Sequence, residues 1–453
     1  MSNCILVTID CLRPDFLGCY GHGSFASPNI DYLAHKGILF ASAFANGVGT
    51  PAAFPSILAS IYPTMCGHKL GIWNHLTIAE VLRKSGYVTA AIHSNPYLSE
   101  YFGYDKGFDS FYYLVPHKEE KRVSVRLGPL KSFLSKKYLS KVTDALKKLS
   151  TPIHRRKSLH QSPYADADVV TKTTLQWIRR YRKENFFLWI HYMDLHFPHR
   201  YFPSTKYPSN ISEKDVVLVN MMYSNPKFVN EDNISKLKRI YEAELRFVDA
   251  MIGIIIRELN RLGIFDKTSI IITSDHGEEF FEHGKIGHDP RLYDELIHIP
   301  LIIYSSELKR EKGKRVTELC SQIDISPTIL DLLGEHKQGC FLGRSVIPLI
   351  SGEYSNKYII SEAPTEPNKI EINLQLRKVA LRTSNWKFIW SANGRHELYN
   401  LSIGEHTNLI NEEVNKAEEL KKLILKHIKW EERERIKMKM RNLKRKLIGY
   451  ESK

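Results

Sequence analysis

The stretch between Thr268 and His288 restricts the fold of this chain more than any other. It opens with an isoleucine-rich run, Thr268-Ser-Ile-Ile-Ile-Thr273, and Asp275-His276-Gly277 follow almost at once. A strand that is buried on both faces of a parallel sheet has such a continuous run. In open α/β sheets, ligands bind just beyond the carboxyl ends of these strands. We therefore predict a buried parallel strand with a functional site at its end; the alternative is a polar turn that only caps the strand.

The polar groups at this strand end indicate a metal site. An adjacent carboxylate and imidazole suit a hard-to-borderline divalent cation. Asp10 follows a second apolar run, Cys4–Ile9, and in a parallel sheet it would face the same rim as Asp275. Taken alone, an Asp after a strand is more often a helix cap. Together with Asp275 and His276, it is better explained as a metal ligand.

Short apolar runs alternate with amphipathic helical stretches along most of the chain. This alternation predicts an α/β fold with a mostly parallel central sheet flanked by helices. The absence of an internal repeat excludes a solenoid. The expected strands are Cys4–Ile9, Tyr87–His93, Phe186–Tyr192, Ser269–Thr273 and Ile299–Tyr304, and the clearest helices are Ile78–Ser85 and Lys236–Leu262.

Changes in composition divide the chain. Residues 1–375 are expected to form the large α/β domain, with a basic insertion or lid at 117–162. Residues 376–412 are expected to form a small C-terminal antiparallel β-sheet subdomain from the runs Val379–Thr383, Trp386–Ser391 and His396–Asn400. Residues 413–453 are expected to form a basic helical tail. This tail is either a solvated helix or a segment that adheres to an anionic membrane surface.

The charge balance favours anionic partners. The 453 residues include 65 Lys and Arg against 50 Asp and Glu, a formal net charge of +15. Phosphate or sulfate esters, polyanionic glycans, anionic lipid and nucleic acid all fit such a charge, and an amino-acid bias of the source organism would give the same total. No groove-reading motif accompanies the basic runs, so specific nucleic-acid binding is not expected.

The sequence predicts a soluble, cytoplasmic protein. The first ten residues enter a strand without the charged leader or long apolar core of a signal peptide. No stretch of about 18 uninterrupted apolar residues is present, so no membrane span is expected. The six cysteines are scattered without CxxC spacing, which favours reduced thiols over a disulfide framework.

Thr50 is a candidate nucleophile. The preceding glycines, Gly47 and Gly49, allow a sharp turn, and Ser56–Ser60 is expected to form a short helix. A hydroxyl near a helix N-terminus lies where backbone N–H groups stabilise an anion. A nearby metal could lower its pKa. The alternative is that Thr50 caps the helix.

Five segments occur in an order that resembles a known family. They are Val7-Thr-Ile-Asp-Cys-Leu-Arg-Pro-Asp15, Tyr192-Met-Asp-Leu-His-Phe-Pro198, Thr273-Ser-Asp-His-Gly-Glu278, Gly287-His288 with Leu292-Tyr-Asp-Glu-Leu-Ile-His-Ile-Pro-Leu301, and Asp324-Ile-Ser-Pro-Thr-Ile-Leu-Asp-Leu-Leu-Gly334. Together they are similar to the sulfatase family of the alkaline phosphatase superfamily. The resemblance extends from residue 3 to about residue 410 and implies an alkaline phosphatase-like fold.

The resemblance implies a metal centre with a built-in nucleophile. Asp10, Asp275 and His276 match the family's metal ligands. Thr50 falls at the position of the nucleophile, which is also bound to the metal. One divalent ion, Ca²⁺, Mn²⁺, Mg²⁺ or Zn²⁺, is therefore expected.

Further positions match residues around the substrate. His196 matches a histidine near the ester oxygen and is a candidate acid for the leaving group. His288 matches a histidine close to the transferred group. His68 occupies another histidine position common in the family and is assigned, with Asp194, to substrate binding. Arg13 is expected to brace the first loop rather than to contact the substrate.

The number of metal ions stays open. Asp194, His196 and His288 could together hold a second cation. Relatives with two metals space the Asp and His of the 193–199 loop more widely, so one ion is favoured.

The nucleophile position departs from the family pattern. Sulfatases carry Cys or Ser there, inside a Cys/Ser-x-Pro-x-Arg signature, and oxidise it to formylglycine. This chain has Thr50-Pro-Ala-Ala-Phe54, and threonine cannot give that aldehyde. Threonine nucleophiles occur in superfamily members that handle phosphoesters, including phosphodiesterases and lipoteichoic acid synthases.

The predicted function is therefore a sulfatase-like, metal-dependent hydrolase or transferase that favours phosphodiester or phosphoryl chemistry. A true sulfatase and a non-catalytic anion-binding protein on the same scaffold are the alternatives. The partner is expected to be an anionic ester, with a glycan or a lipid headgroup among the candidates.

Overall fold

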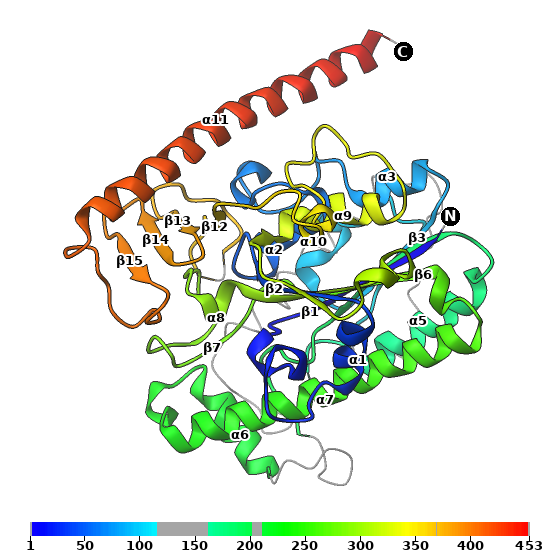
Figure 1. Ribbon diagram of the computed structural model, residues 1–453, viewed down its shortest axis with the longest axis horizontal. Helices are drawn as coiled ribbons and strands as arrows, with labels where there is room; N and C mark the ends of the chain where they lie inside the picture. The colour runs from blue at the N-terminus through cyan, green and yellow to red at the C-terminus, as the bar shows by residue number, and fades with distance from the viewer. Residues whose placement is uncertain (1, 116–161, 202–210, 368, 452–453) are drawn as a thin grey trace.

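The computed structural model describes residues 2–115, 162–201, 211–367 and 369–451 (Figure 1). Apart from Ser162, the expected basic insertion at 117–162 lies outside the described residues, as do residues 202–210. The described chain forms a central sheet between two layers of helices, a separate smaller sheet and one long C-terminal helix.

The central sheet runs in the order β10-β2-β9-β6-β1-β5-β3-β4, and β11 also pairs with β2. Its strands are β1 (Asn3–Ile9), β2 (Ile38–Phe44), β3 (Val88–His93), β4 (Ser110–Tyr113), β5 (Phe186–Tyr192), β6 (Thr268–Ser274), β9 (His298–Tyr304), β10 (Lys314–Val316) and β11 (Cys320–Ser321). All five expected strands are present. The prediction of a mostly parallel sheet is confirmed, because every pair is parallel except the two that β9 makes with β2 and β6.

Helices cover both faces of this sheet. On one face lie α1 (Pro28–Lys36), α5 (Ala167–Tyr181), α6 (Glu213–Met222) and α7 (Glu231–Arg261), and on the other α2 (Thr50–Ala59), α3 (Ile78–Lys84), α9 (Ile325–Leu332) and α10 (Ile347–Ile350) (Figure 1). β1 shows why its run is continuously apolar: Leu6 packs into one hydrophobic core, whereas Ile5 and Val7 pack into the other. Burial on both faces leaves only the strand ends for polar chemistry.

Local sequence signals explain several helix boundaries. α3 begins with a capping box, in which Thr77 accepts from the N–H of Glu80 and the Glu80 side chain accepts from the N–H of Thr77. α7 begins at Glu231, earlier than the expected Lys236, because the Asn230 side chain caps it by accepting from the N–H of Asn233.

The smaller sheet is antiparallel, with the order β12 (Ile359–Ala363), β13 (Lys378–Arg382), β14 (Trp386–Ser391) and β15 (Glu397–Asn400). Its first strand, β12, lies before the expected boundary at residue 376. The sheet therefore includes a strand from the segment that was expected to belong to the large domain. α11 (Val414–Glu451) occupies the segment of the expected helical tail. Its first turns pack on the sheet through Ala417, Leu420 and Ile424, and its far end extends away from the body (Figure 1).

Three short elements lie beside the carboxyl ends of β1 and β6. They are β7 (Glu279–Phe280), β8 (Ile286–Gly287) and α8 (Asp294–Ile297). β7 and β8 pair as a two-stranded ribbon. Within the described residues, no helix is both long enough and apolar enough to cross a membrane.

Candidate active site

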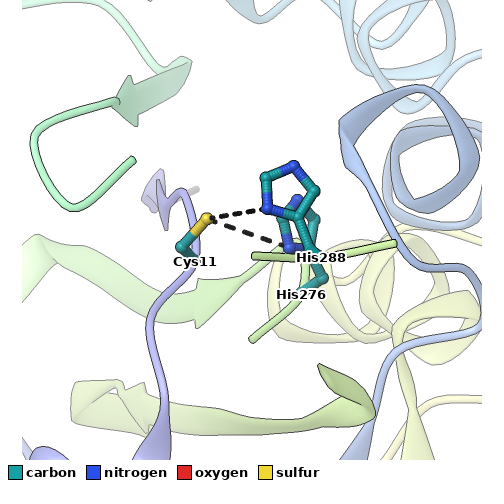
Figure 2. Close-up of side chains that lie close together, drawn as sticks. All are labelled: Cys11, His276 and His288. Carbon is teal, nitrogen blue, oxygen red and sulfur yellow. Dashed lines mark hydrogen bonds between the residues drawn. The ribbon is translucent and has the colours of Figure 1, made fainter. Parts of the chain in front are cut away.

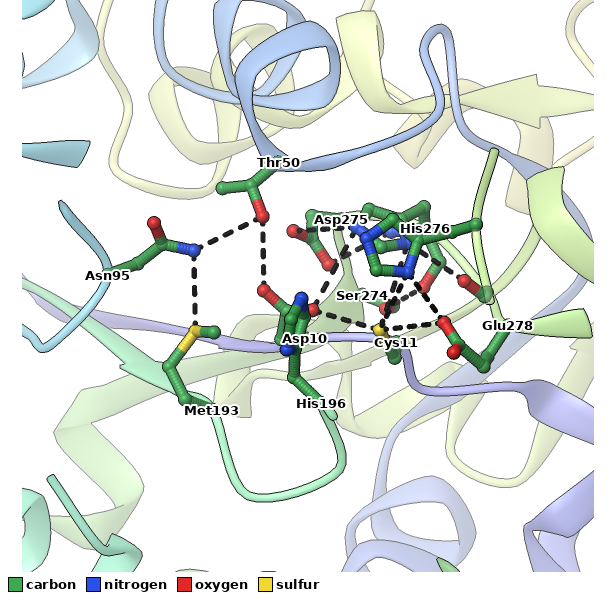
Figure 3. Close-up of polar contacts among 12 residues, drawn as sticks. Asp10, Cys11, Thr50, Asn95, Met193, His196, Ser274, Asp275, His276 and Glu278 are labelled. Atoms are coloured by element: carbon green, nitrogen blue, oxygen red, sulfur yellow. Dashed lines mark hydrogen bonds and ion pairs between the residues drawn. The ribbon is translucent and has the colours of Figure 1, made fainter. Parts of the chain in front are cut away.

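The ends of β1 and β6 bring three predicted ligands together. Ile9 and Ser274 are partners in the parallel register, so the residues that follow them leave the sheet side by side. Asp10, Asp275 and His276 are fully buried, and each offers a ligand atom within 4.8 Å of the others. Figure 3 shows these side chains converging below Thr50. The structure thus gathers the site that the strand-end argument predicts.

The donor set fits a divalent cation. His276 Nδ1 lies 2.8 Å from the carbonyl oxygen of Gly277 and must donate to it, which leaves an unprotonated Nε2 on the other side of the ring. This Nε2 is 3.5 Å from Asp275 Oδ2, and neither atom has a hydrogen-bond partner within the described part of the chain. Burial and then the charge of Asp10 raise the pKa of Asp275 well above its ordinary range. Two buried carboxylates and a free imidazole nitrogen are ligands that a divalent cation would satisfy.

Gly277 allows the chain to turn under this site. A Cβ atom at this position would lie 2.0 Å from the carbonyl oxygen of Glu295, so only glycine fits. Gln322 donates to the carbonyl oxygens of Ser274 and Asp275, which fixes the end of β6 from the opposite side. The position of Asp275 is therefore set by backbone contacts.

Thr50 is the first residue of α2 and is buried beside Asp10. Its hydroxyl donates to Asp10 Oδ2 at 3.1 Å and accepts from Asn95 Nδ2 at 3.2 Å (Figure 3). The expectation of a helix limited to Ser56–Ser60 was wrong, because α2 begins at Thr50 and ends at Ala59. Gly49, with φ 84°, is the N-cap, so the capping alternative for Thr50 is also wrong.

His196 and His288 lie next to each other beside the predicted ligands. Their ring centroids are 5.1 Å apart, and the ring of His288 is 4.5 Å from that of His276. His196 Nδ1 is hydrogen-bonded to the carbonyl oxygen of Phe197. His288 Nδ1 is hydrogen-bonded to Glu278 Oε2 at 2.7 Å. Each ring therefore keeps Nε2 for an incoming group.

The two imidazoles have opposite charge preferences. Burial lowers the pKa of His196, against the opposing charge of Asp10. Burial also acts against the charged form of His288, but the Glu278 carboxylate outweighs it and raises the pKa of His288 to about 9.

The structure does not bring Asp194 and His68 into this cluster. Asp194 is buried and accepts hydrogen bonds from the N–H of Ala167 and from Arg200. Among the residues described, it belongs to no group of three ligand atoms within 4.8 Å, which disfavours a second cation held by Asp194, His196 and His288. His68 is exposed, and its backbone carbonyl accepts from Ile372.

His191 and Asn95 belong to the site, and the sequence reasoning missed both. His191 is fully buried on β5; its Nδ1 is 2.9 Å from Thr8 Oγ1 and its Nε2 is 3.4 Å from Asp10 Oδ2. A histidine inside a fully buried strand is itself a signal, because such a polar ring requires partners. Asn95 gives no comparable signal, since it follows β3 in an ordinary Asn-Pro turn.

Cys11 points its thiol into the same space (Figure 2). Its φ of 59° is unusual for a residue with a side chain, and its Sγ lies 3.0 Å from Asp10 Oδ1 and 3.3 Å from Glu278 Oε2. Cys11, His276 and His288 lie within 4.8 Å of one another. However, both histidines face the sulfur with Nδ1, which already donates to an oxygen. A second metal ion on these three atoms is therefore disfavoured.

Arg13 braces the loop after β1, as expected. It donates to Asp15, to Glu282 and to the backbone carbonyl of Glu278, and its side chain is 9% exposed.

Comparison with known proteins identifies the family. The family model described as Sulfatase matches residues 2–335. The chain belongs to the sulfatase family. The structure is similar to the crystal structure of the phosphonate monoester hydrolase of Agrobacterium radiobacter, with a TM-score of 0.73 and 20% identity, covering 95% of this chain and 96% of the other. At this identity the likeness establishes the fold, which is that of sulfatase-family enzymes.

Curated relatives match the chain over different lengths. Arylsulfatase K of Mus musculus is 31% identical over 196 residues, which are 40% of this chain and 34% of that protein. Arylsulfatase K of Danio rerio is 26% identical over 425 residues, which are 83% of this chain and 74% of that protein. The chain thus spans about a third of the first of these relatives and about three quarters of the second.

Proposed function

We propose that this sulfatase-family chain is a metal-dependent hydrolase or transferase of anionic esters, with Thr50 as its nucleophile and a preference for phosphorus esters over sulfate esters. The observation that carries the proposal is the hydrogen bonding of the Thr50 hydroxyl. It donates its one hydrogen to Asp10 and accepts one bond from Asn95, so one lone pair of the oxygen is left for a metal ion, and transfer of the hydrogen to Asp10 frees another lone pair to attack an ester.

The surrounding groups supply what such an attack requires. A bound divalent cation would lower the pKa of the hydroxyl and offset charge on the equatorial oxygens. Asp10, Asp275, His276 and Thr50 would hold it. The N-terminus of α2, which begins at Thr50, adds partial positive charge where the transferred group would lie.

The proposed reaction begins with an in-line displacement. The bond between Thr50 Oγ and phosphorus forms as the bond between phosphorus and the leaving oxygen breaks. The hydroxyl proton leaves along its hydrogen bond to Asp10, and His196 Nε2 gives a proton to the departing oxygen. Water or a second acceptor then releases the group from Thr50, and this choice decides between hydrolysis and transfer.

The identity of the nucleophile supports phosphorus chemistry. Threonine cannot become the formylglycine of sulfatases, whose hydrated aldehyde expels sulfate. Phe54, at the position of the signature arginine, is fully buried and packs edge-on against His191 with ring centroids 5.1 Å apart. The position therefore holds an apolar core side chain rather than a cation.

Two other functions remain in competition. A true sulfatase agrees with the name of the arylsulfatase K relatives, and a non-catalytic anion-binding protein agrees with the missing signature. The basic tail also supports a proposal that the substrate lies on an anionic surface, with a glycan ester or a lipid headgroup as candidates. A cytoplasmic location remains part of the proposal.

One experiment separates these functions. The purified full chain, loaded in turn with Ca²⁺, Mn²⁺, Mg²⁺ or Zn²⁺, is assayed on nitrophenyl sulfate, phosphate, phosphodiester and phosphonate. We expect turnover of phosphorus esters, and a loss of about a thousandfold or more in Thr50→Ala. Full activity in Thr50→Ala would refute the nucleophile, faster turnover of the sulfate would favour a sulfatase, and metal binding without any turnover would favour the anion-binding protein.

A further inference from the structure

A continuous chain of hydrogen bonds leads from α7 to His288. Glu244, on α7, accepts from His199 Nδ1 at 2.8 Å, and His199 Nε2 is 2.9 Å from the hydroxyl of Tyr223. That hydroxyl donates to Glu278 Oε1 at 3.1 Å, and Glu278 Oε2 accepts from His288 Nδ1 at 2.7 Å. The chain joins α7, the 193–199 loop, the end of α6 and the loop before β7, which are far apart in the sequence.

Counting donors fixes the direction of every bond. Tyr223 has one hydroxyl hydrogen and gives it to Glu278, so its oxygen must accept from His199 Nε2. The other oxygen of Glu244 accepts from the N–H of Arg200, and an ionised Glu244 accepts in both contacts. His199 therefore carries a hydrogen on both ring nitrogens. Burial acts against this charged form, but Glu244 outweighs it and raises the pKa of His199.

The first part of this chain of hydrogen bonds, from Glu244 to Tyr223, is held rigidly. His199 and Glu244 are almost completely buried. Asn220 both accepts from the N–H of His199 and donates to its carbonyl, at 2.8 and 2.9 Å. The Tyr223 ring stacks on Phe197 with centroids 4.4 Å apart. A buried network in which each group is satisfied has one arrangement.

We propose that His199 and Tyr223 are positioning residues for His288. With Glu244 they orient the Glu278 carboxylate, which holds the Nδ1 hydrogen of His288 and leaves Nε2 as the only ring nitrogen available to an ester. The inference rests on the proposed function in one respect, since it takes His288 as the group that meets the substrate. Outer partners that fix a ring in this way are worth about tenfold to a hundredfold in activity in other sites.

The test removes the Tyr223 hydroxyl oxygen from this chain of hydrogen bonds. Tyr223→Phe keeps the ring stacked on Phe197 but loses both hydroxyl bonds. Tyr304→Phe is the matched control: its hydroxyl donates to Asp266 at 3.0 Å, and it pairs with Ile270 near the opposite end of β6 from Asp275. Both variants are measured as the metal-loaded full chain, with their metal content and melting temperatures.

We expect Tyr223→Phe to lower kcat about tenfold to a hundredfold on the best nitrophenyl ester, with KM and metal content unchanged. Tyr304→Phe should keep the wild-type kcat. Glu278→Gln should lower kcat at least as much as Tyr223→Phe, and the double variant should be no slower than Glu278→Gln alone, because the hydroxyl acts through the carboxylate. Equal kcat in the two Phe variants, or multiplied losses in the double variant, would overturn the proposal.

A second readout does not depend on turnover. In protein labelled with ¹⁵N-histidine and loaded with Ca²⁺ or Zn²⁺, the His288 ring signals are assigned by their absence in His288→Gln. Tyr223→Phe should shift these signals, whereas Tyr304→Phe should leave them in place. If the wild type turns over no ester, the proposed function fails and this spectrum alone decides the inference: unshifted His288 signals in Tyr223→Phe would refute it.

Discussion

The Thr50 hydroxyl donates to Asp10 Oδ2 at 3.1 Å, which ties the first residue of α2 to the end of β1. Asp10 is at the same time within ligand distance of Asp275 and His276. The nucleophile and the predicted metal site therefore cannot move independently, and a substitution at one should alter the geometry of the other.

Asp275→Asn should abolish metal binding and yet stabilise the metal-free protein. Asp10 and Asp275 are fully buried, and burial and then the charge of Asp10 raise the pKa of Asp275, so its charged form destabilises the metal-free fold and an uncharged amide avoids that cost. Metal content and melting temperature, each measured with and without added cation, check both parts. The wild type should gain stability on metal addition whereas the variant should not. A metal-free variant that melts below the metal-free wild type would contradict this account.

His196→Gln should slow turnover according to the leaving group. If His196 protonates the departing oxygen, its loss matters most for alkoxides, which need a proton to leave. We expect a loss of about a hundredfold or more on an alkyl ester and much less on a nitrophenyl ester. The measurement is kcat/KM over a series of leaving groups of rising pKa. The same loss throughout the series would exclude the acid role.

Asn95→Leu should lower kcat about tenfold, by roughly the free energy of one hydrogen bond to the nucleophile. The substitution also removes a cap, since Asn95 Oδ1 accepts from the N–H of Tyr97. Asn225→Leu provides the control, because Asn225 precedes Pro226 and accepts from Lys227 in the same way, but has no contact with Thr50 in the described structure. Matching losses of kcat in the two variants would show that the loss comes from the cap of the turn and not from the hydrogen bond to Thr50.

Glu431→Gln should stabilise the protein in a pH-dependent way. Glu431 lies on α11 in a buried cluster with Arg377 and Glu362, where burial and then the charge of Glu362 raise its pKa from 4.5 to about 8. The folded state thus binds a proton that the unfolded state releases, so wild-type stability falls as pH rises from about 4.5 to 8. Gln resembles the protonated form and avoids this loss. The melting temperature of the variant, relative to wild type, should rise between pH 5 and pH 9; a constant difference would be evidence against it.

The predictions that succeeded rest on local patterns. Asp10, Asp275 and His276 each follow a run whose burial on both faces is readable from a few residues, so their meeting point followed from the parallel sheet. The direction of β9 was not readable, because an apolar run looks the same in both directions. The start of α2 was misplaced at Ser56. Pro51 lies in the first turn, where proline is tolerated, but Pro55 lies inside the helix, where proline is normally disfavoured.

The remaining site residues depend on contacts that no local pattern records. The hydrogen bond between Asn95 and Thr50 joins residues 45 positions apart in the sequence, and so does the bond between His199 and Glu244. Each bond connects two separate elements. His68 was assigned to substrate binding by its position in a family pattern. Its side chain is exposed, and the assignment stays a prediction.

Phe54 has a consequence for any attempt to engineer this protein into a formylglycine enzyme. Thr50→Cys alone would provide the oxidisable residue without the rest of the maturation signal. Adding Phe54→Arg would place a guanidinium among Trp189, Tyr104 and His191, in a cage where the present ring is fully buried. The cost of an unpaired buried charge there would be several kcal/mol. The barrier between the two chemistries is therefore set by side-chain packing one helical turn away from the reacting oxygen.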